Sequence, residues 1–382
     1  MTTALDPEPR PLVLRSPHDL LAAIPYRLGF RPAECVVVAC TTADGHLGLV
    51  ARVALDDLAR PDVADGLEPL VRAVVDQRPR ALTAVLYTAR DGAPARALLG
   101  TAIAAVDVGV DVDRWIVTDG GYRGIDCDDP ACCPEQGHPP AALETSEIAV
   151  AHVLAGRQVA PSREVAYRIA PAPADRRALA GRAARRSHDT AADCPDESAR
   201  RAWRTAALDA WREATRCVPV PTERHRGHDA PADQPLGAAL LGRVAAGLAD
   251  RRVRDAVLLT LVPGGDGGAQ DTVTAADPAA VDRATAETLA RVVDPADAVR
   301  PDPGKAERAQ AVLELVVSHT PRRWHAPAAT LLAFLAWWRG DGARASYRVD
   351  EALAADPDHR LAHLVASVVA AGLPPGWVRA EG

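Results

Sequence analysis

The stretch ECVVVACTTADGHLGLVARVAL, residues 34–55, decides the fold class of the first part of this chain. A run of β-branched and other apolar residues is followed by TTADG, which is a turn signal, and then by a second apolar run. The stretch therefore predicts a hairpin of two β-strands over residues 35–55. The segments around it indicate what kind of sheet the hairpin joins.

Strands and helices alternate on both sides of this hairpin. Before it, Ser16 is a candidate cap for a short helix. After it, we expect a helix over about 64–77, a buried strand over 81–89, a helix in APARALLGTAIAAV and a strand in VDVDRWIVTD. The alternation predicts an α/β domain over residues 1–155, with a mixed, mostly parallel sheet and helices on both faces.

The pattern changes after about residue 155. Apolar residues recur at helical spacing through the rest of the chain, and a stretch rich in proline and charged residues interrupts them at 218–235. We expect a helix and linker region over 156–235, followed by a helical domain over 236–382. The spacing requires no strand in this half.

The last helices resemble a tetratricopeptide unit at about 326–359. That pattern is a helix-turn-helix of about 34 residues in which small residues let two helices pack closely. The chain has small residues at the corresponding positions and a proline after the second helix: Ala333, Gly340, Ala345, Ala352 and Pro357. A single repeat cannot bury its own face, so we expect packing against neighbouring helices, with a peptide-binding groove as the alternative.

Composition and charge argue against several functional classes. The chain has 382 residues, a hydrophobic content of 48% and a net charge of −7, which indicate a globular protein rather than a nucleic-acid binder. The longest apolar stretch, residues 328–338, is too short for a membrane span and predicts a buried helix. The N-terminus has no cationic start followed by an apolar run, so we expect a cytoplasmic protein.

The common catalytic signatures are missing. Around the single lysine, Lys305, Val299 and Ala306 stand where a phosphate loop requires Gly and Ser or Thr. There is no H-E-x-x-H, G-x-S-x-G or G-x-G-x-x-G, and the glycine-rich stretch 263–271 predicts a flexible loop. These absences favour a protein-binding or scaffold module with a regulatory role, in which a protein partner contacts the C-terminal helices. The sequence identifies no cofactor.

The sharpest candidate site is YRGIDCDDPACCPEQGHPP, residues 122–140. Three interpretations of Cys127, Cys132 and Cys133 remain open: buried structural thiols, which we favour, a reversible disulfide that includes Cys127, and a bound metal ion. A metal would need a fourth ligand such as His138, and adjacent cysteines do not easily both ligate one tetrahedral ion. We expect the loop beyond the carboxyl ends of the strands, where ligands gather in such sheets.

An enzyme acting on a small molecule at the C-terminal edge of the sheet is a further hypothesis. Polar residues beside the cysteines supply candidate groups for it: Tyr122, Arg123, Asp126, Asp128 and Asp129. Acidic residues in such a loop also cap turns, and we expect that role more often.

Four segments follow one another along nearly the whole chain: SPHDLLAAIPYRLGFRPAECVVVAC, CDDPACCPEQGHPP, RVRDAVLL and WWRGDGARASYRVDEALAADPDHRLAHL. In this order they resemble the landmarks of an actinobacterial family named only as domain of unknown function 4192. The resemblance carries over no activity. The family tends to have a small hydroxyl residue at the position of Cys35, which implies that Cys35 is a packed strand residue. It usually lacks a histidine at the position of His138, which argues against that residue as a required ligand.

Overall fold

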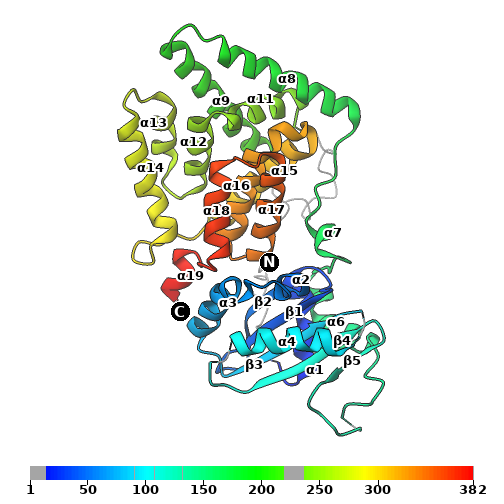
Figure 1. Ribbon diagram of the computed structural model, residues 1–382. Helices are drawn as coiled ribbons and strands as arrows, with labels where there is room; N and C mark the ends of the chain where they lie inside the picture. The colour runs from blue at the N-terminus through cyan, green and yellow to red at the C-terminus, as the bar shows by residue number, and fades with distance from the viewer. Residues whose placement is uncertain (1–13, 90, 107, 131, 219–235, 382) are drawn as a thin grey trace, which may run out of the picture. The chain divides into compact units, whose positions relative to one another are not determined.

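The computed structural model describes residues 14–381, apart from residues 90, 107, 131 and 219–235 (Figure 1). Contacts divide the chain into two units. The first consists of Met1–Arg168 and Ala370–Gly372, and the second consists of Ile169–Val369 and Leu373–Gly382. The domain boundaries expected at residues 155 and 235 stay predictions, and most of the expected linker lies outside the described residues.

The first unit contains a five-stranded sheet. Its strands, in the spatial order β2-β1-β3-β4-β5, are β1 (Cys35–Thr41), β2 (Leu47–Ala54), β3 (Ala81–Tyr87), β4 (Val112–Thr118) and β5 (Gly121–Gly124). The predicted hairpin is confirmed as β1 and β2. The prediction of a mostly parallel sheet is wrong. Among the described strand pairs only β3–β4 is parallel, and the other three are antiparallel.

The lengths of the connections explain the strand directions. The helix α4 (Ala93–Ala105) joins β3 to β4 and returns the chain to the same end of the sheet, as a parallel pair requires. Only residues 119 and 120 separate β4 from β5, so these two strands must pair in opposite directions. Strand β5 was not predicted, because its residues, Gly-Tyr-Arg-Gly, show no run or alternation of apolar side chains.

Apolar side chains pack on both faces of this sheet. On one face, Val36, Leu86 and Ile116 pack against α4 and the two helices between β2 and β3, α2 (Leu55–Leu58) and α3 (Val63–Gln77). Because strand residues alternate between faces, Trp115 points to the opposite face. There its ring contacts His18 of α1 (Pro17–Leu28). The expected cap of α1 is confirmed, since Ser16 accepts a hydrogen bond from the amide of Asp19 at 3.2 Å.

Three short helices complete the described part of the first unit before residue 168. They are α5 (Ala141–Glu144), α6 (Glu147–Leu154) and α7 (Arg163–Tyr167). The residues between β5 and α5 form the cysteine loop.

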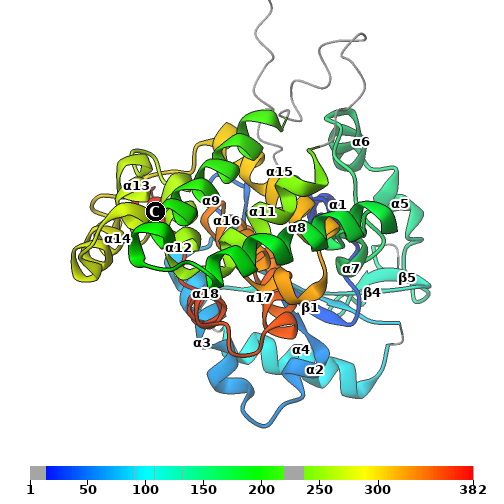
Figure 2. The ribbon, with the colours of Figure 1, turned by 90° about the horizontal axis from the view of Figure 1, so that it is seen from above.

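The described residues of the second unit form helices and no strands. They are α8 (Ala174–Ala192), α9 (Glu197–Cys217), α11 (Ala238–Ala249), α12 (Arg251–Leu261), α13 (Asp266–Thr274), α14 (Pro278–Val293), α15 (Pro303–His319), the 3-10 turn η1 (Arg322–Trp324), α16 (His325–Trp338), α17 (Gly342–Ala355), α18 (Arg360–Ala370) and α19 (Gly376–Glu381). Helices α8 and α11 lie side by side (Figure 2). A Cβ atom at Gly242 would lie 2.3 Å from the carbonyl oxygen of Ala180, so this close packing requires glycine. No described helix is both long enough and apolar enough to cross a bilayer.

Helices α16 and α17 form the pair that resembles a tetratricopeptide unit. Ala333, Ala345 and Ala352 are fully buried, Gly340 has a φ of +81° in the turn between the helices, and Pro357 follows α17. Ala352 packs in a small cluster with Ala329 and Ala362, which belongs to α18. The alternative of a peptide-binding groove stays a prediction.

Candidate thiol site

The cysteine loop leaves the sheet at an unexpected end. Strand β5 runs back along β4, so that Gly124 pairs with Trp115 and the amide of Ile125 donates to the carbonyl oxygen of Arg114. Cys127 therefore lies toward the amino end of β4. The prediction that the loop lies beyond the carboxyl ends of the parallel strands is wrong for its cysteines, because the unpredicted β5 reverses the chain.

The loop closes on β5 through backbone hydrogen bonds. The amide of Tyr122 donates to the carbonyl oxygen of His138 at 3.0 Å, and the amide of His138 donates to that of Tyr122 at 2.8 Å. Gly137 has a φ of +77°, a left-handed conformation that favours glycine, and its amide donates to the carbonyl oxygen of Pro134. Both ends of the loop are thus held at one short strand.

This closure brings the three sulfur atoms together. The Sγ atoms of Cys127, Cys132 and Cys133 all lie within 4.8 Å of one another. The amides of Cys132 and Cys133 both donate to the carbonyl oxygen of Asp129, at 3.1 and 2.7 Å, which fixes the turn that carries the two adjacent cysteines. The amide of Gly124 donates to the sulfur of Cys133 at 3.4 Å.

The three thiols differ in exposure. Cys133 is buried, Cys127 is half-buried and Cys132 is exposed. Burial therefore accounts for the position of Cys133 but not for that of Cys132. The pKa of Cys132 is raised to about 11, because its thiol is hydrogen-bonded to Cys127 and lies beside the charge that Cys127 would carry, with smaller effects of the same kind from Cys133. Without a metal, Cys132 is therefore protonated at neutral pH.

His138 supports the loop through its ring. Its Nε2 atom lies 2.7 Å from the carbonyl oxygen of Cys132, and because that oxygen can only accept, Nε2 is the donor. His138 is not among the ligand atoms that converge within 4.8 Å. The structure thus places it as a group that holds the backbone of Cys132.

His18, which was not among the predicted site residues, packs against His138 and Tyr122. The ring of His18 lies 4.9 Å from that of His138 and 5.0 Å from that of Tyr122. The Nε2 atom of His18 and the hydroxyl oxygen of Tyr122 are 3.1 Å apart. Burial, with a smaller contribution from the charge of His138, lowers the pKa of His18. The only sequence signal for His18 was its place in the first turn of α1.

The polar residues suggested for an enzyme are mostly engaged elsewhere. Tyr122 is 1% exposed and contacts His18. Arg123 forms an ion pair with Asp91 at 3.0 Å, and Asp126 forms one with Arg114 of β4. Asp129 holds the cysteine turn through its carbonyl oxygen. No contact places Asp128 near a second catalytic group among the described residues.

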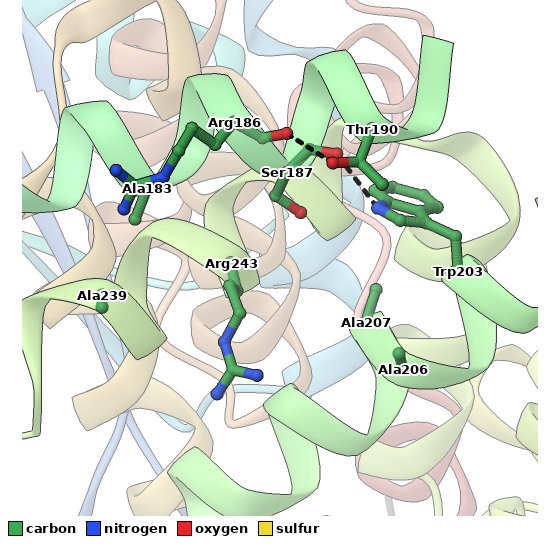
Figure 3. Close-up of a pocket in the computed structure, with 9 residues that line it drawn as sticks. All are labelled: Ala183, Arg186, Ser187, Thr190, Trp203, Ala206, Ala207, Ala239 and Arg243. Atoms are coloured by element: carbon green, nitrogen blue, oxygen red, sulfur yellow. Dashed lines mark hydrogen bonds between the residues drawn. The ribbon is translucent and has the colours of Figure 1, made fainter. Parts of the chain in front are cut away.

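A cavity of about 310 Å³ lies in the second unit between α8, α9 and α11 (Figure 3). Its charged lining residues are Arg186 and Arg243, both exposed, and Arg243 lies 3.5 Å from Glu213. Trp203 also lines it and donates through Nε1 to the carbonyl oxygen of Ser187 at 3.0 Å. The lining residues include no cysteine, histidine or carboxylate, so the cavity has fewer candidate catalytic or metal-binding groups than the thiol loop.

The thiol geometry suits a single metal ion. With zinc–sulfur bonds of about 2.3 Å, sulfur atoms around a tetrahedral ion lie about 3.8 Å apart. The three cysteine sulfurs are already within 4.8 Å without an ion, so small side-chain rotations complete such a site. Three thiolates would leave the fourth position of a tetrahedral ion open to water or to an external ligand.

A sequence model described as Domain of unknown function (DUF4192) matches residues 17–292 and 273–376 of the chain. No curated protein and no solved structure matches this chain.

Proposed function

Since the chain belongs to the DUF4192 family, whose description names no activity, we propose its function from the geometry of the site: the protein is a thiolate metalloprotein that binds one zinc ion. The ligands are Cys127, Cys132 and Cys133. The observation that carries this proposal is the convergence of three thiols within 4.8 Å in one short loop. Thiolates are the ligands that select zinc and other soft transition metals.

The number of converging thiols favours a metal over the two other interpretations. A disulfide needs two cysteines and gives the third no role. Structural thiols should be buried, whereas Cys132 is exposed and still lies beside the other two sulfurs. A metal ion uses all three, including the exposed one.

Adjacent cysteines do not easily share one ion, but the backbone turn at Asp129 favours such sharing here. Both cysteine amides donate to the carbonyl oxygen of Asp129, so one tight turn carries the two adjacent residues. In this turn their sulfurs lie within 4.8 Å of each other and of Cys127. His138 then acts as a second layer of support, because it anchors the carbonyl of Cys132.

The site is regulatory in this proposal. Three thiolates and one Zn²⁺ carry a net charge of about −1, which makes the ion a weak electrophile and suits a sensor better than a hydrolytic centre. A reducing, cytoplasmic compartment keeps the three thiols available for the ion. The scaffold role for the C-terminal helices also remains a proposal, supported by the packed α16–α17 pair but by no described binding surface.

The test is an equilibrium zinc titration of reduced, metal-stripped full-length protein in competition with a chromophoric chelator. We expect about one zinc ion per chain. Replacing Cys127, Cys132 or Cys133 by Ser should lower the zinc affinity at least about 100-fold, because the loss of a ligand lowers affinity more than the loss of a residue that supports a ligand. Cys217→Ser is the matched control, because Cys217 is also an exposed thiol but lies on α9. Equal affinity in wild type and all three loop variants would refute the proposal.

A further inference from the structure

We propose that the thiol site is also a redox switch, in which hydroperoxide oxidises Cys132 and a disulfide between Cys132 and Cys127 releases the metal. The release step rests on the proposed zinc site. The choice of cysteine pair does not, because it follows from the arrangement of the thiols alone.

Exposure selects the thiol that reacts first. An oxidant from solvent must reach a sulfur atom, and Cys132 is the exposed member of the cluster. Cys133 is 7% exposed, and its sulfur also accepts a hydrogen bond from the amide of Gly124. Cys127 is half-buried, so it is less accessible to an oxidant than Cys132 but more accessible than Cys133.

Geometry selects the partner. The sulfurs of Cys132 and Cys127 lie within 4.8 Å of each other, and four residues separate the two cysteines in the chain, so a bond between them closes a loop rather than a single peptide. A bond between Cys132 and Cys133 would instead distort the peptide that joins them, because a disulfide requires a specific separation and torsion of its two cysteines. Cys133 therefore remains a thiol, held in place by the backbone of β5.

Metal coordination prepares Cys132 for this reaction. Thiolates rather than thiols attack peroxides, so the Cys132 thiol must lose its proton before it reacts. A bound zinc ion removes that proton, since a coordinating thiol is deprotonated. The metal thus holds the exposed sulfur in its reactive ionisation state.

The chemistry balances in two steps. The Cys132 thiolate attacks one oxygen of hydrogen peroxide, the O–O bond breaks, and hydroxide leaves and takes a proton to form water, which gives a sulfenic acid. The Cys127 thiolate then attacks that sulfur, the S–O bond breaks, and hydroxide again leaves as water after protonation. Two thiolates have lost two electrons to the peroxide, the zinc ion keeps its charge, and only Cys133 still ligates it.

The experiment treats zinc-loaded and metal-free full-length protein with hydrogen peroxide, blocks the remaining thiols by alkylation, and digests without reduction. Cleavage before Asp128 or Asp129 separates Cys127 from the other two cysteines, so mass spectrometry identifies the linked peptides. A zinc-binding dye follows release of the ion in parallel. The variants Cys132→Ser and Cys133→Ser distinguish the two possible partners of Cys127, and Cys217→Ser is the control.

We expect a link between Cys127 and Cys132 in both forms, loss of about one zinc ion per loaded chain, and recovery of binding after reduction. The link should persist in Cys133→Ser and Cys217→Ser and disappear in Cys132→Ser. A link from Cys127 to Cys133, a link between Cys132 and Cys133, or retention of zinc in the linked protein would overturn the switch. If the reduced protein binds no zinc, the proposed function fails, while the metal-free digest still decides the pairing.

Discussion

The amide of Gly124 donates a hydrogen bond to the sulfur of Cys133, 3.4 Å away, and joins the last residue of β5 to the thiol cluster. A side chain at Gly124 would crowd this contact. A Cβ atom at Gly124 would lie 3.3 Å from the sulfur of Cys133 and 3.3 Å from the Cβ atom of Cys127. The end of the strand therefore sets the position of two of the three thiols.

The first prediction follows from this contact. Gly124→Ala should push the two cysteines apart by a few tenths of an ångström and lower zinc affinity by about 10-fold or more, as changes in supporting residues do. Gly120→Ala, in the turn before β5, is the matched control, because a Cβ atom there would come no closer than 3.8 Å to Thr118. Competition titration measures both. Unchanged affinity in Gly124→Ala would show that the contact does not position the ligands.

His138→Gln tests whether His138 supports the loop or binds the ion. Loss of its hydrogen bond to the carbonyl of Cys132 should lower affinity by about 10- to 100-fold, while the number of ligands to the metal stays the same. The absorption spectrum of the Co²⁺-substituted protein reports that number. If wild type and His138→Gln have the same spectrum, His138 positions the loop. If the spectrum of His138→Gln shows that the Co²⁺ ion has lost a ligand, His138 is that ligand.

Zinc affinity should rise with pH. The raised pKa of Cys132 means that the metal must displace its proton at any pH below about 11, so binding releases protons and weakens as the pH falls. Calorimetry at pH 7 in buffers of different ionisation enthalpy should detect that release, and titrations from pH 6 to 8 should show affinity increasing by about 10-fold or more per pH unit. Cys132→Ser should show a shallower dependence. An affinity independent of pH would contradict thiol ligation.

Periodicity predicted most of the sheet-forming unit. The hairpin, α3, α4, β3 and β4 all have runs or alternations of apolar residues longer than four residues, and the structure confirms each. The mostly antiparallel character of the sheet was missed for two reasons: β1 also pairs antiparallel with β3, which no local pattern shows, and β5 has too few residues to show a pattern. The two-residue connection, rather than a residue preference, decides the direction of the β4–β5 pair.

The glycine-rich stretch 263–271 shows another limit of local reasoning. It predicted a flexible loop, but α13 begins at Asp266. A Cβ atom at Gly265 would lie 2.2 Å from the carbonyl oxygen of Leu259, so the absence of a side chain there permits the close turn that leads into the helix. Tertiary packing overrode the low helix propensity of glycine.

The cysteines of the site were evident from their spacing, but their surroundings were not. His18 and Tyr122 contact each other although 104 positions separate them in the chain. No short pattern encodes such a contact, because it depends on how α1 packs across the sheet. The unequal exposure of the three thiols likewise depends on the turn at Asp129 rather than on residue type.

A prediction on stability concerns the α16–α17 pair. Ala345 is fully buried, so Ala345→Leu should overpack the core and lower the free energy of unfolding by about 1–3 kcal/mol. Ala354→Leu, at an exposed position of the same helix, should change it by less than about 0.5 kcal/mol. Urea denaturation measures both. Equal stability of the Ala345 variant and wild type would argue against close packing through this residue.

The most direct test of the central claim is zinc-edge X-ray absorption of the reduced, zinc-loaded protein, because it counts the sulfur atoms bound to the ion. The account predicts three sulfurs at about 2.3 Å and one lighter ligand at about 2.0–2.2 Å, with one sulfur lost in Cys132→Ser. A shell of nitrogen and oxygen atoms without sulfur would contradict it, as would a sulfur shell that Cys132→Ser leaves intact.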